Sequence, residues 1–188
     1  MRRVTWFVVI TASGLLLLSF LTLVQAQAPA AKAGFKYVGA KACKMCHNTV
    51  AQGKQYDIWF ASKHSKAYAT LASPKALEVA KAKGIADPQK DAKCLKCHVT
   101  GQAAAKEMLA PTYSMEEGVT CEGCHGPGEK YKDMKVMKDK KLAMENGLIM
   151  PTEKTCTGCH NSESPTYKEF KFTEAAKLIA HPKPKPQG

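Results

Sequence analysis

The chain is poor in the large apolar side chains that normally form the core of a soluble protein. Residues 27–188 contain six Val, four Ile, seven Leu and four Phe, which make 21 of these 162 residues. This share is about 13 %, and values below about 20 % in a charged chain usually accompany disorder. Side chains alone therefore cannot give this chain an ordinary hydrophobic core.

Arginine is also scarce. It is confined to Arg2 and Arg3, and all the other basic residues are lysines. Lysine offers a point charge, whereas the planar fork of arginine matches the geometry of phosphate. No segment resembles a nucleic-acid-binding module, so we expect no nucleic-acid partner. The formal net charge of +12 can instead attract acidic protein partners.

The chain has a single long apolar run, Val4–Val24, near its start. The three residues 24–26 satisfy the small-residue rule for signal peptide cleavage. We therefore expect residues 1–26 to be a signal peptide and the rest of the chain to be periplasmic or otherwise exported. The alternative is an uncleaved anchor, because the run reaches the length of about 20 residues that spans a bilayer. Membrane contact is expected only through such a leader.

One cysteine motif dominates the rest of the chain. All eight cysteines lie in four copies of C-x-x-C-H, at Cys43–His47, Cys94–His98, Cys121–His125 and Cys156–His160. This motif is the attachment signature of a c-type haem, in which both thiols form thioether bonds and the histidine is the proximal iron ligand. The expected attachment residues are Cys43, Cys46, Cys94, Cys97, Cys121, Cys124, Cys156 and Cys159. The expected proximal ligands are His47, His98, His125 and His160.

Two other interpretations of the cysteines are zinc binding and disulfide formation. Pairs of C-x-x-C motifs build tetrahedral zinc sites, and an even number of cysteines can form a disulfide framework. Both interpretations leave the histidine after every second cysteine as a fourfold coincidence. The sequence therefore favours four haem c groups, each with its iron, and no zinc.

Four haems also account for the missing core, because porphyrin faces can supply the apolar surface that side chains do not. They would bring up to eight propionates, which would offset most of the positive charge. We expect a mainly α, small multihaem cytochrome fold in which the haems form the core, with few or no strands. It should form one domain over residues 27–181, followed by a disordered Pro/Lys tail at 182–188. We expect the haem-free chain to have little tertiary structure.

Local signals predict where several helices begin and end. Ser73 followed by Pro74 is an N-cap with proline in the first helical position, and Gly84 stops that helix. Further helices are expected over residues 49–71 with a break near Ser62, over 129–145, over the fourth motif with Thr152 as its cap, and from Thr173 to His181.

The chain has too few histidines to place a second one on every iron. Only His64 and His181 lie outside the motifs, so at most two haems can have two histidine ligands within one chain. Met134 and Met137 would share one face of the expected 129–145 helix, and either could be a distal ligand. The alternatives are a solvated His64, a tail position for His181, and methionines that only fill the core.

Several segments resemble the tetrahaem cytochrome c-554 family of ammonia oxidisers, over about residues 37–181. They include Trp59…His64 after the first motif, Val99-Thr100-Gly101 after the second, Gly118-Val119-Thr120 before the third, Gly126-Pro127-Gly128 after it, and Phe170-Lys171-Phe172 before His181. The resemblance implies a mainly helical fold around stacked haems. It also implies that His64 and His181 are distal ligands and that the haem on His98 is open.

The chain departs from the family at one position. The family places a further distal histidine shortly after Gly-Pro-Gly, as partner to the first haem, and this chain has none there. Met134 lies one position before the expected place and Met137 two positions beyond it. We therefore expect the haem on His47 to be His/Met-ligated. His64 and His181 would then serve the third and fourth haems, in either pairing.

These features predict an electron-transfer protein that carries electrons through four haems between redox protein partners. The first alternative is a reductase of a small nitrogen oxide or hydroxylamine at an open haem on His98. Such a site needs proton donors near the iron, and residues 99–105 contain no titratable group, so the sequence favours electron transfer over catalysis. The second alternative is a subunit of a larger redox complex or a haem filament.

Overall fold

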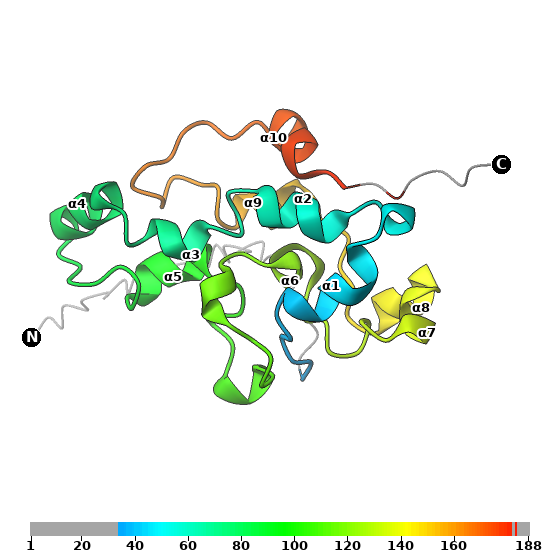
Figure 1. Ribbon diagram of the computed structural model, residues 1–188. Helices are drawn as coiled ribbons and strands as arrows, with labels where there is room; N and C mark the ends of the chain where they lie inside the picture. The colour runs from blue at the N-terminus through cyan, green and yellow to red at the C-terminus, as the bar shows by residue number, and fades with distance from the viewer. Residues whose placement is uncertain (1–33, 182, 184–188) are drawn as a thin grey trace, which may run out of the picture.

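The computed structural model describes residues 34–181 and 183, which form short helices joined by long irregular segments (Figure 1). The α-helices are α1 (Lys41–His47), α2 (Gln55–Ala61), α3 (Ala67–Thr70), α4 (Pro74–Ala82), α5 (Ala92–His98), α6 (Cys121–His125), α7 (Met134–Met137), α8 (Lys140–Glu145), α9 (Glu153–Thr157) and α10 (Phe172–Ile179). Three 3-10 helices lie between them, namely η1 (Val50–Gln52), η2 (Lys106–Met108) and η3 (Met115–Glu117). The described residues contain no strand, only an isolated bridge between Tyr37 and Leu109. The expected mainly α fold is confirmed.

Each cysteine motif begins within a short helix. The first three motifs end at the last residues of α1, α5 and α6, and the fourth begins in α9. Residues three and four apart lie on one face of a helix. A helical turn therefore points both thiols and the following histidine of a C-x-x-C-H motif in the same direction, as one flat ligand requires.

The sequence predicted three of the helix boundaries well. The hydroxyl of Ser73 accepts a hydrogen bond from the Ala76 N–H (3.2 Å), and α4 starts at Pro74. The expected break near Ser62 is also present, because Ser62 adopts an extended backbone and ends α2. Thr152 precedes α9 as expected, and its N–H donates to the Thr155 hydroxyl (3.1 Å).

Two helix predictions were wrong. Residues 129–145 form two helices, α7 and α8, because Asp139 starts a new helix. Its carboxylate accepts from the N–H groups of Lys141 (2.8 Å) and Leu142 (3.0 Å), as an N-cap does. The last helix begins at Phe172 and ends at Ile179, so Thr173 lies inside α10 and does not cap it.

The hydrophobic core of the described residues is small and divided. One cluster joins Ala40, Tyr56 and Trp59, and the other joins Leu71, Leu95 and Val99. Three of the ten buried apolar side chains are alanines, which bury little area. Burial of this extent stabilises a chain only weakly against the conformational entropy that folding removes.

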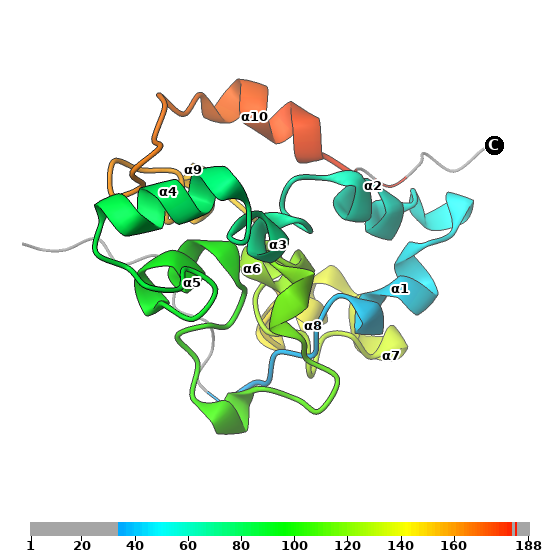
Figure 2. The ribbon, with the colours of Figure 1, turned by 60° about the vertical axis from the view of Figure 1, so that its left-hand side comes forward.

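The C-terminal helix packs on the outside of the structure. Figures 1 and 2 show α10 on the side of the molecule that carries α2 and α9. The segment after α9 first runs away from α2, and α10 then leads back towards α2. No helix within residues 34–181 is long and apolar enough to cross a membrane. The expected leader (1–26) and all but one residue of the expected tail (182–188) lie outside the described residues, and both stay predictions.

Candidate haem sites

The first and third motifs line a common cavity of about 240 Å³. Cys43 and His47 reach it from α1, and Cys121, Cys124 and His125 reach it from α6. Further parts of its wall come from His64, His181, Trp59, Tyr131, Leu148 and Ile179. Apolar side chains suit the faces of a haem, and the thiols and imidazoles supply the groups that would attach it and bind its iron.

His64 faces the histidine of the fourth motif. The ring centroids of His64 and His160 are 6.1 Å apart, with 79° between the ring planes. An iron–imidazole bond is about 2 Å long, so two imidazoles on opposite faces of one iron have centroids about 6 Å apart. The His64–His160 pair therefore has the spacing of two axial ligands. Phe170 stacks on His160 at 4.7 Å between ring centroids.

His181 faces the histidine of the third motif in the same way. The ring centroids of His125 and His181 are 5.9 Å apart, with 53° between the planes. The two histidines outside the motifs thus meet different motif histidines, although each pair is far apart in the sequence. The sequence alone left this pairing open.

Two motif histidines are oriented by backbone carbonyls. His98 Nδ1 lies 2.8 Å from the Ala67 carbonyl oxygen, and His125 Nδ1 lies 3.0 Å from the Ile149 carbonyl oxygen. In the tautomer in which Nδ1–H donates to the carbonyl, Nε2 keeps its lone pair for a metal. Both histidines are therefore held as ligands require.

Burial favours the neutral form of His64 and His125. It lowers the pKa of His64, and the nearby His160 lowers it further. Burial also lowers the pKa of His125, against the opposing effect of its hydrogen bond to Ile149. Iron binds the neutral imidazole, so these surroundings suit ligation.

Among the methionines, Met137 lies at the cavity and Met134 does not. Met137 shares the cavity wall with His47, whereas the side chain of Met134 is 62 % exposed. Met150 also lines the cavity, and sequence reasoning missed it. The sequence carries no signal for Met150, because the contact of the preceding Ile149 carbonyl with His125 is visible only in the structure.

The cysteines order the four motifs in space. The Cys43 thiol lies beside the Cys121 thiol, and the Cys97 thiol lies beside the Cys159 thiol. Burial, followed by the nearby Cys156, raises the pKa of the Cys124 thiol to about 11. The first motif is therefore next to the third, the third next to the fourth, and the fourth next to the second.

The segment before the third motif holds His64 in place. The Val119 N–H donates to the His64 carbonyl (3.0 Å), and the Trp59 indole N–H donates to the Val119 carbonyl (2.8 Å). Gly118 has a positive φ of +68°, and a Cβ there would lie 2.7 Å from the His64 carbonyl oxygen. The sequence Gly118-Val119 is thus needed for the close approach of these two segments.

Glu122, a variable residue of the third motif, joins that motif to two other segments. Its buried carboxylate accepts hydrogen bonds from the N–H groups of Val38 (2.8 Å), Gly39 (2.8 Å) and Gly128 (2.7 Å). Burial raises the pKa of Glu122, although these three N–H groups lower it in part. Sequence reasoning gave Glu122 no role, because the variable residues of the motif need none.

Comparison with known proteins places this geometry in a family. Residues 42–126 match the family described as cytochrome c554 and c-prime. Cytochrome c-554 of Nitrosomonas europaea is 34 % identical over 182 residues, which cover 87 % of this chain and 73 % of that protein. No solved structure matches the chain significantly. The chain belongs to the cytochrome c-554 family, and it is a c-type cytochrome that transfers electrons between redox proteins through covalently bound haem c.

Proposed function

We propose that the chain carries four haems, one on each C-x-x-C-H motif, and conducts electrons along them in the periplasm. The proximal ligands are His47, His98, His125 and His160. The observation that carries this proposal is the presence of two pairs of facing imidazoles, each at about the spacing of two axial ligands. Bound haem iron supplies the one-electron chemistry.

The proposed distal ligands are His64 for the fourth haem and His181 for the third. The first haem then takes Met137, which shares the cavity with His47. Methionine ligation raises the potential of a haem relative to two histidines. The second haem has no distal ligand among these residues, since both histidines outside the motifs face other sites.

The spatial order of the motifs supports a single path for electrons. Neighbouring cysteine thiols lead from the first motif to the third, the fourth and the second. The ends of this path are therefore the first and second sites, which also differ in their distal ligands. The protein contributes by holding neighbouring sites close together and by setting the environment of each iron.

Electron paramagnetic resonance during a redox titration tests the proposal on the purified holoprotein. We expect four haems per chain: two low-spin with bis-histidine ligation, one low-spin with His/Met ligation, and one high-spin. Replacing His64→Ala should convert one bis-histidine signal to high spin, and His181→Ala should convert the other. Loss of the same signal in both variants, or a haem count below four, would contradict the proposed sites.

A second candidate function is catalysis at the second haem. The observation that favours it is the pairing of His64 with His160 and of His181 with His125, which leaves no histidine outside the motifs for the iron on His98. An open iron could reduce a small nitrogen oxide or hydroxylamine. The reduced holoprotein should then bind nitric oxide or carbon monoxide at one haem, and a spectrum unchanged by either gas would exclude this function.

A further inference from the structure

The first haem site lies beneath a face of the molecule that is both basic and apolar. This face is the outer side of residues 41–66, which comprise α1, η1, α2 and the five residues after α2. We refer to it as the α1–α2 face. The helices α1 and α2 pack against each other, and Figures 1 and 2 show them as neighbours. Cys46 in α1 is the exposed one of the eight cysteines, so an attachment residue of the first motif lies at this surface.

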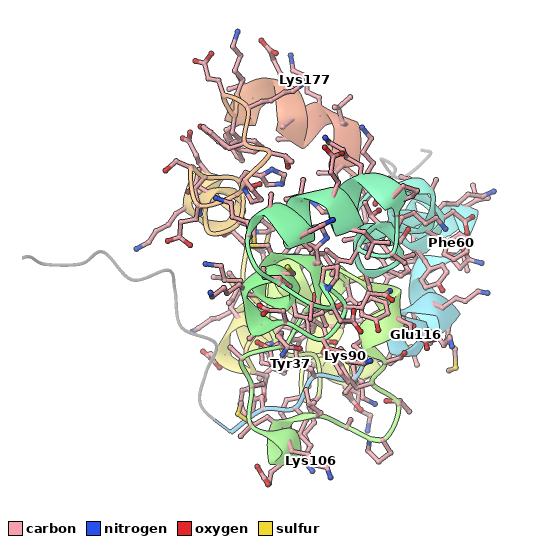
Figure 3. All side chains as sticks on the ribbon, turned by 90° about the vertical axis from the view of Figure 1, so that its left-hand side faces the viewer. Tyr37, Phe60, Lys90, Lys106, Glu116 and Lys177 are labelled. Carbon is pink, nitrogen blue, oxygen red and sulfur yellow. The ribbon has the colours of Figure 1, made fainter. Side chains whose placement is uncertain are left out.

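Three apolar side chains of the α1–α2 face project into solvent. Met45 is 87 % exposed, Val50 72 % and Phe60 54 %, and Figure 3 shows Phe60 at the outer edge of the structure. Scattered exposed apolar residues are common, but these three fall within one short segment. Exposed aromatic residues and methionines are typical of the centres of protein–protein interfaces.

Phe60 also connects this face to the cavity. Its ring stacks on Tyr56, with 6.1 Å between centroids and 11° between planes, and its centroid lies 6.3 Å from that of Trp59. Tyr56 and Trp59 are buried and line the cavity that holds the first motif. A partner that touches Phe60 would therefore be separated from the first site by one layer of aromatic rings.

The charge of the same segment is strongly positive. Residues 41–66 contain five lysines and a single acidic residue, Asp57, whereas residues 151–177 balance four lysines with four glutamates. All five lysines are exposed. Among the described residues, the ion pairs involve other lysines, including Lys96 with Glu163 near the second motif. Lys44 and Lys66 lie over the rings of Tyr56 (5.3 Å) and Phe60 (4.3 Å).

We propose that the α1–α2 face is the docking surface through which the first haem exchanges electrons with an acidic redox protein. This inference rests on the proposed function. Exposed lysines around an apolar centre fit a partner that presents carboxylates around an apolar patch. Such charges mainly raise the association rate and orient the encounter. They suit a transient electron-transfer complex, in which small interfaces are usual.

The test measures the reduction of the oxidised holoprotein by reduced flavodoxin, a small acidic electron carrier, in a stopped-flow instrument. The variant Lys44→Glu/Lys66→Glu reverses two charges on the α1–α2 face. The matched control Lys81→Glu/Lys83→Glu makes the same charge change at two exposed lysines at the end of α4, on the opposite side of the molecule in Figure 1. At low ionic strength we expect the first variant to lower the second-order rate constant about tenfold or more, and the control less than about twofold.

Two further measurements separate docking from other effects. Because salt screens the attraction, the difference between the variants should disappear at high ionic strength. Met45→Gln should slow the reduction several-fold at every ionic strength, since it removes apolar contact without changing charge. Equal slowing in both charge variants, or no slowing in either, would overturn the docking surface.

The same samples distinguish failure of the docking surface from failure of the proposed function. Dithionite, a small reductant that needs no docked complex, should reduce all haems in every variant. If it does, and the flavodoxin rates do not separate the variants, only the docking surface is wrong. If dithionite leaves the haems oxidised in the unmodified protein, electron transfer through them is itself refuted.

Discussion

Gly118 shows how a single residue without a side chain can position a ligand. A Cβ at this residue would lie 2.7 Å from the His64 carbonyl oxygen and 3.2 Å from the Ala67 nitrogen. We expect Gly118→Ala to displace the His64 backbone and to convert the bis-histidine signal of the fourth haem to high spin. The change should also cost the holoprotein more than about 2 kcal/mol, because a backbone at φ +68° and ψ −132° by itself costs about 1–3 kcal/mol in a residue with a Cβ.

Gly84 provides the matched control for this prediction. It has the same φ of +68°, but a Cβ there would meet nothing within 4 Å. Gly84→Ala should therefore show the backbone cost without loss of any haem signal. If the two variants have identical resonance spectra, Gly118 does not position His64.

The carboxylate of Glu122 gives a second prediction, which depends on pH. Glu122→Ala leaves the buried N–H groups of Val38, Gly39 and Gly128 without their acceptor, and each such group costs about 1–3 kcal/mol. Because burial raises the pKa of Glu122 from 4.5, the folded state binds the carboxyl proton more tightly than the unfolded chain. The contribution of Glu122 is therefore complete below pH 4.5 and declines as the pH rises through the raised pKa.

Thermal unfolding of the holoprotein across this pH range measures the effect. The loss of stability in Glu122→Ala should be largest at acid pH and smaller at neutral pH. Glu116→Ala, which changes an exposed glutamate nearby in the sequence, should alter stability by less than about 0.5 kcal/mol at every pH. A penalty for Glu122→Ala that grows with rising pH would contradict this account.

At the level of helices, the orientation of α7 favours one of its two methionines as a ligand of the first haem. Met134 and Met137 belong to the same four-residue helix, but Met137 lines the cavity, whereas the side chain of Met134 is exposed. We expect Met137→Ala to abolish the weak long-wavelength charge-transfer absorption of a His/Met haem and to lower one reduction potential. Met134→Ala should change neither, since its side chain is largely exposed.

Met150→Ala extends the same experiment to the other methionine in the cavity wall. If Met150→Ala removes the absorption and Met137→Ala does not, the ligand comes from the segment after α8 and the assignment to α7 is wrong. The spectrum of each variant can be recorded on the oxidised holoprotein, and its unfolding midpoint shows whether the remaining fold is intact.

These helices also show what the sequence could and could not predict. Ser73 and Pro74 act on their own helix, so the start of α4 follows from the residues beside it. Asp139 is an equally local cap, but the surrounding lysines and methionines favour helix on both sides and hide the break. The His64–His160 and His125–His181 pairs depend on the path of the whole chain, which no local signal fixes. The C-x-x-C-H motifs were visible because their chemistry is contained in five consecutive residues.

For the molecule as a whole, the arrangement of sites is asymmetric. The first motif lies against the exposed, lysine-rich α1–α2 face, whereas Lys96 in the second motif is paired with Glu163. In the proposed path, which runs from the first motif to the third, fourth and second, these unlike surroundings would lie at opposite ends. An electron carrier with unlike ends can meet two partners of different chemistry without competition for one surface.

The divided core leads to a prediction about the haem-free chain. The two buried clusters contain three residues each and lie apart, while the cavity between the first and third motifs is open. Without haem, folding would bury little apolar area and still pay the entropy of ordering the long irregular segments. We therefore expect the chain expressed without haem attachment to show weak near-ultraviolet circular dichroism and no cooperative thermal transition. The holoprotein, measured in the same buffer, should unfold in one cooperative step, and a haem-free chain that did the same would show that side chains alone hold this fold.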